Sequence, residues 1–579
     1  MNYNRDKKDM EHQSESKICQ NCKTSFIIEQ EDFNFYEKMK VPAPTWCPEC
    51  RMARRFLFMN TWNLYRRNCE KCGESTLSMF SEDKPHKVFC LPCWWSDDWD
   101  GTEYAINYDP SRSFLEQMKE LELRTPWMAN TMMYTMNVNS PYCNATGPVK
   151  NCYMLFWADY CENSFYSSYL NTLKDSIDCY RVAHSELCYE GTGLNKCYRT
   201  FFSEECDSCT DTWFSRACSG LVNCFGCINL RNKNYCIFNE QYSQEDYFKK
   251  VKEFDLISHT SLEKIKKDVL VFWSKYPRRF YNGNALNKNV SGDYIYESKN
   301  AQNCFMVSGA EDCKFTQFVS IPKAKDCYDN TGWGDGSERI YESTVVGLGA
   351  SNVKFSNECW PNAMNTEYSI YAIGGCKDIF GCVNLKKKQY CILNKQYSKE
   401  EYEKLKEKII KDMNINTFID SKNRVYKYGD SLPIELSPFS YNESNAGKFL
   451  PITKEKALEQ GFTWSEGKVN EYKITAKASD LPDTISYTTD EILNDVFECA
   501  SCQRAYKFTL GELNLMRRLS LPLPHKCFHC RQEFRFSRSN QARLYDRNYM
   551  KCGVDLKTSY NPDNTEIVYC EKCYQQEVY

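Results

Sequence analysis

The feature that most constrains this chain is a pattern of paired cysteines that occurs twice, once near each end. The first set contains four C-x-x-C pairs, Cys19/Cys22, Cys47/Cys50, Cys69/Cys72 and Cys90/Cys93. Adding 480 to each residue number gives the second set without a gap in register, Cys499/Cys502, Cys527/Cys530, Tyr549/Cys552 and Cys570/Cys573. Only Cys69 lacks a cysteine counterpart, because Tyr549 stands there. The sequence therefore predicts one metal-binding module placed at both ends of the chain.

The spacing of these pairs predicts zinc. A C-x-x-C turn places two thiolates on one side of an ion, and a second such turn completes the tetrahedral shell of a structural zinc site. The spacers of 24 residues from Cys22 to Cys47 and 17 residues from Cys72 to Cys90 fit two such sites in series. The second module repeats them, but its last site keeps only Cys552, Cys570 and Cys573. We therefore expect three Zn2+ ions per chain, with the fourth site either metal-free or completed by another residue.

The stretch 19–55 resembles the widespread zinc-binding domain of treble-clef or zinc-ribbon type. The matching features are the first C-x-x-C pair, Phe26, the acidic Glu31-Asp32 before Phe35-Tyr36, Lys38, and the C-P-x-C-R motif at 47–51. With WCPECR and the CWW at 93–95, nearly the whole chain is similar to a family of large uncharacterised zinc-binding proteins of candidate-phyla bacteria. This resemblance implies zinc binding and brings no established activity.

The abundance of cysteine also bears on the compartment. Thirty-four Cys would indicate disulfides in a small secreted protein, but this chain has 579 residues and begins MNYNRDKKDMEHQ, without an apolar signal region. No apolar run approaches the length of a membrane span. These features predict a cytoplasmic protein with reduced or metal-bound thiols and no membrane association.

Between the two modules the cysteines follow a different period. From Cys143 to Cys206 they recur every nine residues, with one step skipped at Leu170, and a shifted series continues at 209, 218, 227 and 236. A short period with one small apolar residue per repeat is typical of a β-solenoid, whose coils place that residue at the same interior position. Because stacked side chains run parallel, they do not meet the geometry of a disulfide. We expect an interior ladder of thiols, in which only Cys206/Cys209 and Cys224/Cys227 are spaced like metal ligands.

This central region is duplicated as well. The run FGCINLRNKNYC begins at Phe225, and the similar run FGCVNLKKKQYC begins at Phe380. Each is followed by a capping box that opens an amphipathic helix, Ser243/Asp246 in the first copy and Ser398/Glu401 in the second. The second copy is less regular, and we expect coils of about 23 residues with one short and one long side. A right-handed parallel β-helix is the preferred form, and a flatter two-sided roll is the alternative.

The predicted fold is mostly β and multidomain, with a tandem parallel β-solenoid core flanked at both ends by double four-cysteine zinc modules and joined by short helical connectors. The expected segments are a disordered tail (1–16), the N-terminal zinc module (17–100), a helical connector (101–140), the first solenoid (141–242), a helical cap and linker (243–288), the second solenoid (289–397), a second helical cap (398–415), a small α+β connector (416–496) and the C-terminal zinc module (497–579).

The sequence does not indicate catalysis. Its six His lie in no metal-hydrolase or nucleophile motif, and an all-cysteine zinc site has no open coordination position. Asp175, Asp178, Glu186 and Glu190 could supply the carboxylate pair of a β-helix enzyme that acts on carbohydrate, but we interpret them as turn residues. Such an enzyme is kept as a second alternative.

Arginines interleaved with aromatic residues point to a nucleic-acid partner. Guanidinium groups beside Phe56, Trp62 and Tyr65 suit phosphate contact and base stacking, although the net charge of -3 provides no general attraction. The candidate residues are Arg51, Arg54, Arg55, Arg66, Arg67, Arg531, Arg535, Arg538 and Arg547. We therefore predict a non-catalytic protein that binds RNA or a ribonucleoprotein through its terminal modules, with a cytoplasmic protein-interaction scaffold as the alternative.

Overall fold

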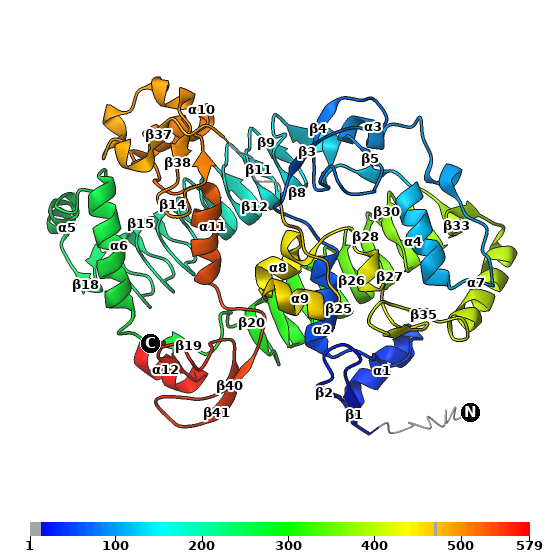
Figure 1. Ribbon diagram of the computed structural model, residues 1–579. Helices are drawn as coiled ribbons and strands as arrows, with labels where there is room; N and C mark the ends of the chain where they lie inside the picture. Colours follow the sequence, from blue (N-terminus) through cyan, green and yellow to red (C-terminus); the bar gives the residue numbers. More distant parts are fainter. Residues whose placement is uncertain (1–12, 468–471, 579) are drawn as a thin grey trace, which may run out of the picture. The chain divides into compact units, whose positions relative to one another are not determined.

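The computed structural model describes residues 13–467 and 472–578, so most of the predicted disordered tail lies outside the described residues. The chain forms two compact units, each built from two separate segments (Figure 1). The first unit combines the chain up to Ala129 with Gly283–Glu466, and the second combines Asn130–Asn282 with the chain from Gly467 onward. The N-terminal cysteine module therefore shares a unit with the second solenoid, and the C-terminal module shares a unit with the first solenoid.

The predicted tandem β-solenoid is confirmed, but its first copy has coils of twelve residues. In this copy Ser168 pairs in parallel with Tyr180, and Tyr198 pairs with Thr210. A final antiparallel pair closes the sheet. The strands are β7 (Asn137–Val138), β8 (Asn144–Thr146), β9 (Val149–Lys150), β10 (Phe156–Asp159), β11 (Cys161–Glu162), β12 (Ser168–Lys174), β13 (Tyr180–Glu186), β14 (Tyr198–Phe201), β15 (Thr210–Trp213), β16 (Val222–Phe225), β17 (Cys236–Ile237) and β18 (Glu240–Gln241).

A three-residue step explains why the nine-residue period does not equal one coil. Backbone φ is positive at Asn151, Met154, Trp157 and Tyr160, so the chain turns a corner every third residue and four three-residue sides make one coil. The residue that follows each corner points inward, as Cys152, Leu155, Ala158 and Cys161 do, and each of these is at most 2% exposed. Nine residues therefore span three of the four sides. Successive cysteines are all buried as predicted, but they lie on different sides of the coil.

The second solenoid has longer and less uniform coils. Gly292 pairs with Cys304, Ala310 with Ala324 and Glu338 with Ser351, so the coils contain 12, 14 and 13 residues. The expectation of coils of about 23 residues was wrong, because the spacing of the cysteines does not reveal the Ser, Val and Ala that share the interior. The strands are β20 (Gly292–Tyr296), β21 (Lys299–Gln302), β22 (Cys304–Ser308), β23 (Ala310–Lys314), β24 (Gln317–Val319), β25 (Ala324–Trp333), β26 (Glu338–Val346), β27 (Ser351–Lys354), β28 (Asn357–Trp360), β29 (Met364–Glu367), β30 (Ile370–Ile373), β31 (Lys377–Phe380), β32 (Val383–Lys386), β33 (Gln389–Ile392) and β34 (Lys395–Gln396).

Helices follow the last coil of each solenoid. Ser243 caps α5 (Gln244–Lys252), and Ser398 forms a full capping box with Glu401 at the start of α7 (Lys399–Met413), as predicted. Tyr247 of α5 packs on Tyr235, and Tyr402 of α7 packs on Tyr390, so each helix covers the final coil. The other connecting helices are α4 (Phe114–Arg124), α6 (His259–Trp273), α8 (Asn445–Phe449) and α9 (Lys454–Glu459).

The remaining connecting strands are short: β6 (Trp127–Met128), β19 (Arg278–Arg279), β35 (Phe418–Ile419), β36 (Val425–Tyr426) and β37 (Ala476–Lys477). Among the described residues, no helix is both long enough and apolar enough to cross a membrane.

The interior thiols should be chemically inert in the folded chain. Burial raises the pKa of Cys152 to about 11 and that of Cys179 to about 12, and the thiolate is the form that reacts with alkylating reagents. We expect iodoacetamide to label the solenoid cysteines only after denaturation, while the exposed Cys22 and Cys502 react once metal is removed. Mass spectrometry of peptides from labelled protein measures this. Rapid labelling of Cys152 or Cys179 in native protein would contradict an interior position.

Candidate metal centres and their attachment to the solenoids

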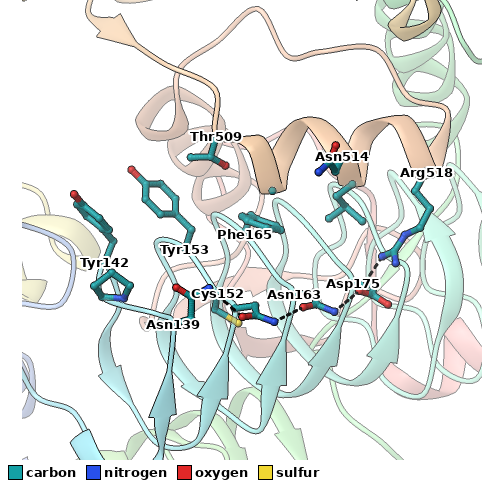
Figure 2. Close-up of a pocket in the computed structure, with 14 residues that line it drawn as sticks. Asn139, Tyr142, Cys152, Tyr153, Asn163, Phe165, Asp175, Thr509, Asn514 and Arg518 are labelled. Atoms are coloured by element: carbon teal, nitrogen blue, oxygen red, sulfur yellow. Dashed lines mark hydrogen bonds and ion pairs between the residues drawn. The ribbon is translucent and has the colours of Figure 1, made fainter. Parts of the chain in front are cut away.

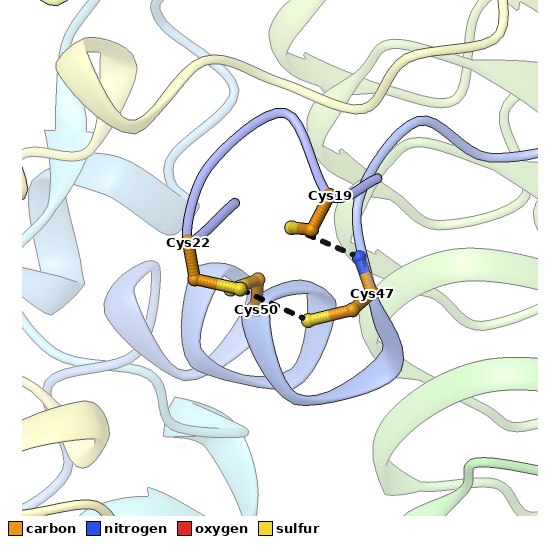
Figure 3. Close-up of side chains that lie close together, drawn as sticks. All are labelled: Cys19, Cys22, Cys47 and Cys50. Carbon is orange, nitrogen blue, oxygen red and sulfur yellow. Dashed lines mark hydrogen bonds between the residues drawn. The ribbon is translucent and has the colours of Figure 1, made fainter. Parts of the chain in front are cut away.

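The first cysteine cluster is formed by a hairpin turn and the start of a helix. Strands β1 (Glu15–Ile18) and β2 (Ser25–Ile28) flank the turn that carries Cys19 and Cys22. Cys47 is the N-cap of α2 (Pro48–Leu57), and Cys50 lies in its first turn. The Sγ atoms of Cys22 and Cys47 are 3.7 Å apart, and the Cys47 N–H donates to Cys19 Sγ at 3.2 Å (Figure 3). All four sulfurs lie within 4.8 Å of one another, so they can surround one metal ion.

Two more clusters repeat this arrangement. The second holds Cys69, Cys72, Cys90 and Cys93, between the hairpin of β3 (Tyr65–Asn68) and β4 (Ser75–Ser78) and the short segment of β5 (Val88–Phe89) and α3 (Leu91–Trp95). The third holds Cys499, Cys502, Cys527 and Cys530, between the hairpin of β38 (Phe497–Glu498) and β39 (Ala505–Tyr506) and the start of α11 (Phe528–Ser537). In each, the third cysteine donates its backbone N–H to the first sulfur at 3.2 Å.

The local backbone favours ionised sulfur at these sites. Burial opposes ionisation of Cys499, but the N–H groups of Cys527, Cys502 and Ser501 lower its pKa to about 6. The equivalent groups lower the pKa of Cys69 to about 7 against the same effect of burial. Thiolate is the form that binds metal, and four sulfurs within 4.8 Å of one another can surround one ion. The cysteines predicted as ligands are thus brought together, and a metal-binding role is supported.

The fourth cluster contains three sulfurs. Cys552, Cys570 and Cys573 lie together between the hairpin of β40 (Tyr545–Asn548) and β41 (Asp555–Thr558) and the segment of β42 (Val568–Tyr569) and α12 (Glu571–Val578). The turn keeps its backbone hydrogen bonds, since Tyr549 N–H donates to Val554 O at 3.2 Å, just as Cys69 N–H donates to Glu74 O at 2.8 Å. The Tyr549 side chain is buried with Phe280, Tyr560 and Val568. The turn therefore persists without a fourth thiolate.

In the first unit, the recurring arginines attach the metal-bearing helix to the second solenoid. Arg51 and Arg55 are one turn apart on α2 and both pair with Asp329 on β25, at 2.9 and 2.8 Å. Arg54 pairs with Glu342 on β26 at 2.7 Å. All three arginine side chains and both carboxylates are at most 3% exposed.

The second unit contains the same attachment. Arg531 and Arg535 of α11 both pair with Asp178 of the first solenoid, at 2.9 Å each. Burial by itself lowers the pKa of Arg531, but the negative charges of Asp178 and Glu512 raise that pKa above its ordinary value. Glu512 lies on α10 (Leu510–Leu519), which corresponds to α1 (Gln30–Met39) of the first module. In each unit, one solenoid aspartate therefore forms ion pairs with two arginines of the helix that carries metal-binding cysteines.

The expectation that these arginines face solvent for phosphate contact was wrong. Besides the five residues just described, Arg67 donates to Ser81 O and His86 O, and Arg547 donates to Asn561 O and Glu566 O. Arg538 pairs with Glu204 and is partly buried. Of the nine candidate residues only Arg66 is classed as exposed. The partners Asp178 and Asp329 were missed because acidic residues at solenoid corners look like ordinary turn residues. The one available signal was that both modules repeat arginines for which zinc coordination has no use.

Two of the other acidic residues considered for a catalytic cleft, Asp175 and Glu190, are also engaged in ion pairs. Asp175 pairs with Arg518 at 2.8 Å, and Glu190 pairs with Lys266 at 3.1 Å. These contacts fit the interpretation of structural corner residues better than that of an acid–base pair.

Metal content should distinguish the three complete clusters from the incomplete one. We expect elemental analysis to give three tightly bound zinc ions per chain, and Tyr549→Cys to raise the number to four because it restores the missing thiolate. Tyr549→Phe is the matched control and should leave the number at three. Cys47→Ser should unfold the N-terminal module, since structural zinc supplies folding free energy directly. One bound ion or none in the wild-type chain would contradict this assignment.

The shared aspartate should contribute strongly to stability. Asp178→Ala leaves Arg535 buried without its counter-charge and leaves Arg531 only Glu512, at 3.7 Å. Removing one partner of a buried ion pair typically costs about 3 to 5 kcal/mol. The control Asp211→Ala removes an exposed partner of Arg199 on the same solenoid and should cost less than about 1 kcal/mol. Hydrogen exchange of the α11 amides, together with denaturant unfolding, measures both. Equal effects of the two changes would show that Asp178 does not anchor the helix.

No protein-family model matches the chain, and a search of curated proteins finds no match. The features that bear on its function are therefore the cysteine clusters, the buried arginine–aspartate attachments and the solenoid surfaces.

Proposed function

We propose that this chain is a non-catalytic, metal-stabilised scaffold that binds a partner protein on the surface of its solenoids. The observation that carries the proposal is the burial of the recurring arginines. Zinc coordination has no use for arginine, so the repeat of Arg51 and Arg55 as Arg531 and Arg535 needs another explanation. Their pairing with Asp329 and Asp178 provides one, because it ties each metal-bearing helix to a solenoid.

The metal clusters support a structural role over a catalytic one. Three of them offer four sulfurs each, and such a shell leaves no coordination position for a substrate. The metal instead fixes the start of α2 and of α11, from which the anchoring arginines project. A solenoid held in this way presents a rigid surface, which lowers the entropic cost of binding a partner.

RNA or a ribonucleoprotein is the second candidate, and a different set of residues would have to hold it. Arg504, Lys507 and Lys526 are exposed on the C-terminal module. The equivalent residues of the N-terminal module are Thr24, Ile27 and Trp46, so these basic residues are not part of the repeat. These residues therefore support at most one basic surface, on the C-terminal module, and not two equivalent nucleic-acid-binding surfaces at the two ends of the chain.

Copurification and RNA binding decide between the two candidates. After nuclease treatment of a lysate, we expect the affinity-purified chain to retain a stoichiometric protein partner. We also expect single-stranded RNA to bind weakly even at low salt, because the shared arginines are internal. The test variant is the triple change Arg504→Glu, Lys507→Glu and Lys526→Glu, with Arg66→Glu as a control on the other module. RNA binding that is tight, falls steeply with salt and is lost in the triple variant would replace the protein-scaffold proposal.

A further inference from the structure

An open hollow of about 530 Å3 lies in the second unit, between the first coils of its solenoid and α10 (Figure 2). A row of amide side chains forms one edge, and Tyr142 and Tyr153 rise on the other. Helix α10 covers one end, where it contributes Asn514, Leu515 and Arg518. The volume is within the usual range for sites that bind small molecules.

The amide row consists of corner residues one coil apart. Asn139 donates to Asn151 at 3.1 Å, Asn151 to Asn163 at 3.2 Å, and Asn163 to Asp175 at 3.0 Å. Each such bond uses one N–H of a donor and one oxygen lone pair of an acceptor, whereas an Asn amide has two N–H groups and two lone pairs. Asn139 and Asn151 are exposed, so their remaining donors and acceptors are open to a ligand. The row therefore offers paired hydrogen-bonding groups at regular intervals.

The first unit shows which part of this hollow is structural. Its solenoid has the same row, in which Asn289 donates to Asn300 and Asn300 to Asp312, and Lys38 pairs with Asp326 on the next coil. Lys38 is the counterpart of Arg518, which pairs with Asp175. A row of hydrogen-bonded corner amides beside an aspartate–cation pair is thus common to both units and needs no ligand to explain it.

The aromatic wall is particular to the second unit. Tyr142, Tyr153 and Phe165 follow Asn139, Asn151 and Asn163 by three, two and two residues, and the same offsets in the other row give Gly292, Gln302 and Lys314. The Tyr142 and Tyr153 rings are 5.0 Å apart, and both are half-buried. Helix α10 approaches closely because Gly511 has no side chain, and a Cβ there would lie 2.6 Å from the Phe165 ring.

We propose that this hollow is a binding site for a neutral oligosaccharide. Sugar hydroxyls both donate and accept hydrogen bonds, which matches amides that offer both, and the C–H face of a pyranose ring packs on an aromatic face. The charge of Asp175 is balanced by Arg518, so the site favours an uncharged ligand. The site goes beyond the proposed scaffold function and is independent of it.

The spacing of the amide row allows contact with successive residues of a linear saccharide. Neighbouring coils are about 4.8 Å apart, so the amides recur at intervals close to the length of one sugar residue. Asp175 is engaged by both Arg518 and Asn163, so the site is built to bind a sugar and not to cleave it.

Titration of the full chain with linear neutral oligosaccharides tests this site. The probes are cello-, xylo- and manno-oligosaccharides of two to five residues, followed by isothermal calorimetry. We expect at least one series to bind, with affinity rising to three or four residues. Tyr153→Ala should weaken binding about tenfold, while Tyr153→Phe keeps the ring face and should change it little. Asn151→Ala should also weaken binding, and its matched control Asn300→Ala in the other unit should not.

Each outcome decides the inference. Three results would overturn the inference: no binding of any of the three series, binding that survives Tyr153→Ala, or binding of a linear peptide in place of sugar. Thermal melting should first show that Tyr153→Phe and the control variants are folded. Release of reducing ends from a bound oligosaccharide would refute the non-catalytic function and leave the saccharide assignment standing. Absence of a protein partner in the copurification would likewise refute the scaffold function and leave the saccharide assignment standing.

Discussion

The structure depends on two buried carboxylates, Asp329 in the first unit and Asp178 in the second. Each receives two guanidinium groups from arginines four residues apart, which lie on one face of a helix. The same helix carries two metal-binding cysteines at its start. The metal site therefore positions the start of the helix, and the arginines of that helix pair with the aspartate at a solenoid corner. A buried pair of this kind adds little net stability by itself, but removing one partner is costly, so it fixes where the module sits.

This linkage joins parts of the chain that are far apart in sequence. Asp329 lies 278 residues after Arg51, and each unit is built from two segments separated by the other unit's residues. The second unit cannot be completed until the C-terminal module has been synthesised. Contacts at such separation are formed late, because the entropy of closing a long loop is lost before the contact is gained.

The solenoid explains the unusual abundance of aromatic residues. Its coils turn at every third residue through a left-handed conformation, which is costly for residues other than glycine. Stacking between coils offsets that cost. Phe202 and Phe214 stack in parallel with centroids 4.7 Å apart, and Trp157 and Tyr169 stack in parallel at 5.8 Å. Small side chains fill the interior while rings line the outside, so cysteine and tyrosine are abundant for complementary reasons.

The sequence by itself determined the two cysteine modules, the tandem solenoid and the helices that follow it, because C-x-x-C turns, short repeats and capping boxes are local signals. It did not reveal the twelve-residue coil, because Cys, Ser, Val and Leu share one interior row and the cysteines alone recur every nine residues. It could not show that Arg51 and Arg531 are internal, because their partners lie hundreds of residues away. Only the tertiary structure decided which module meets which solenoid, and with it which basic residues remain open to a partner.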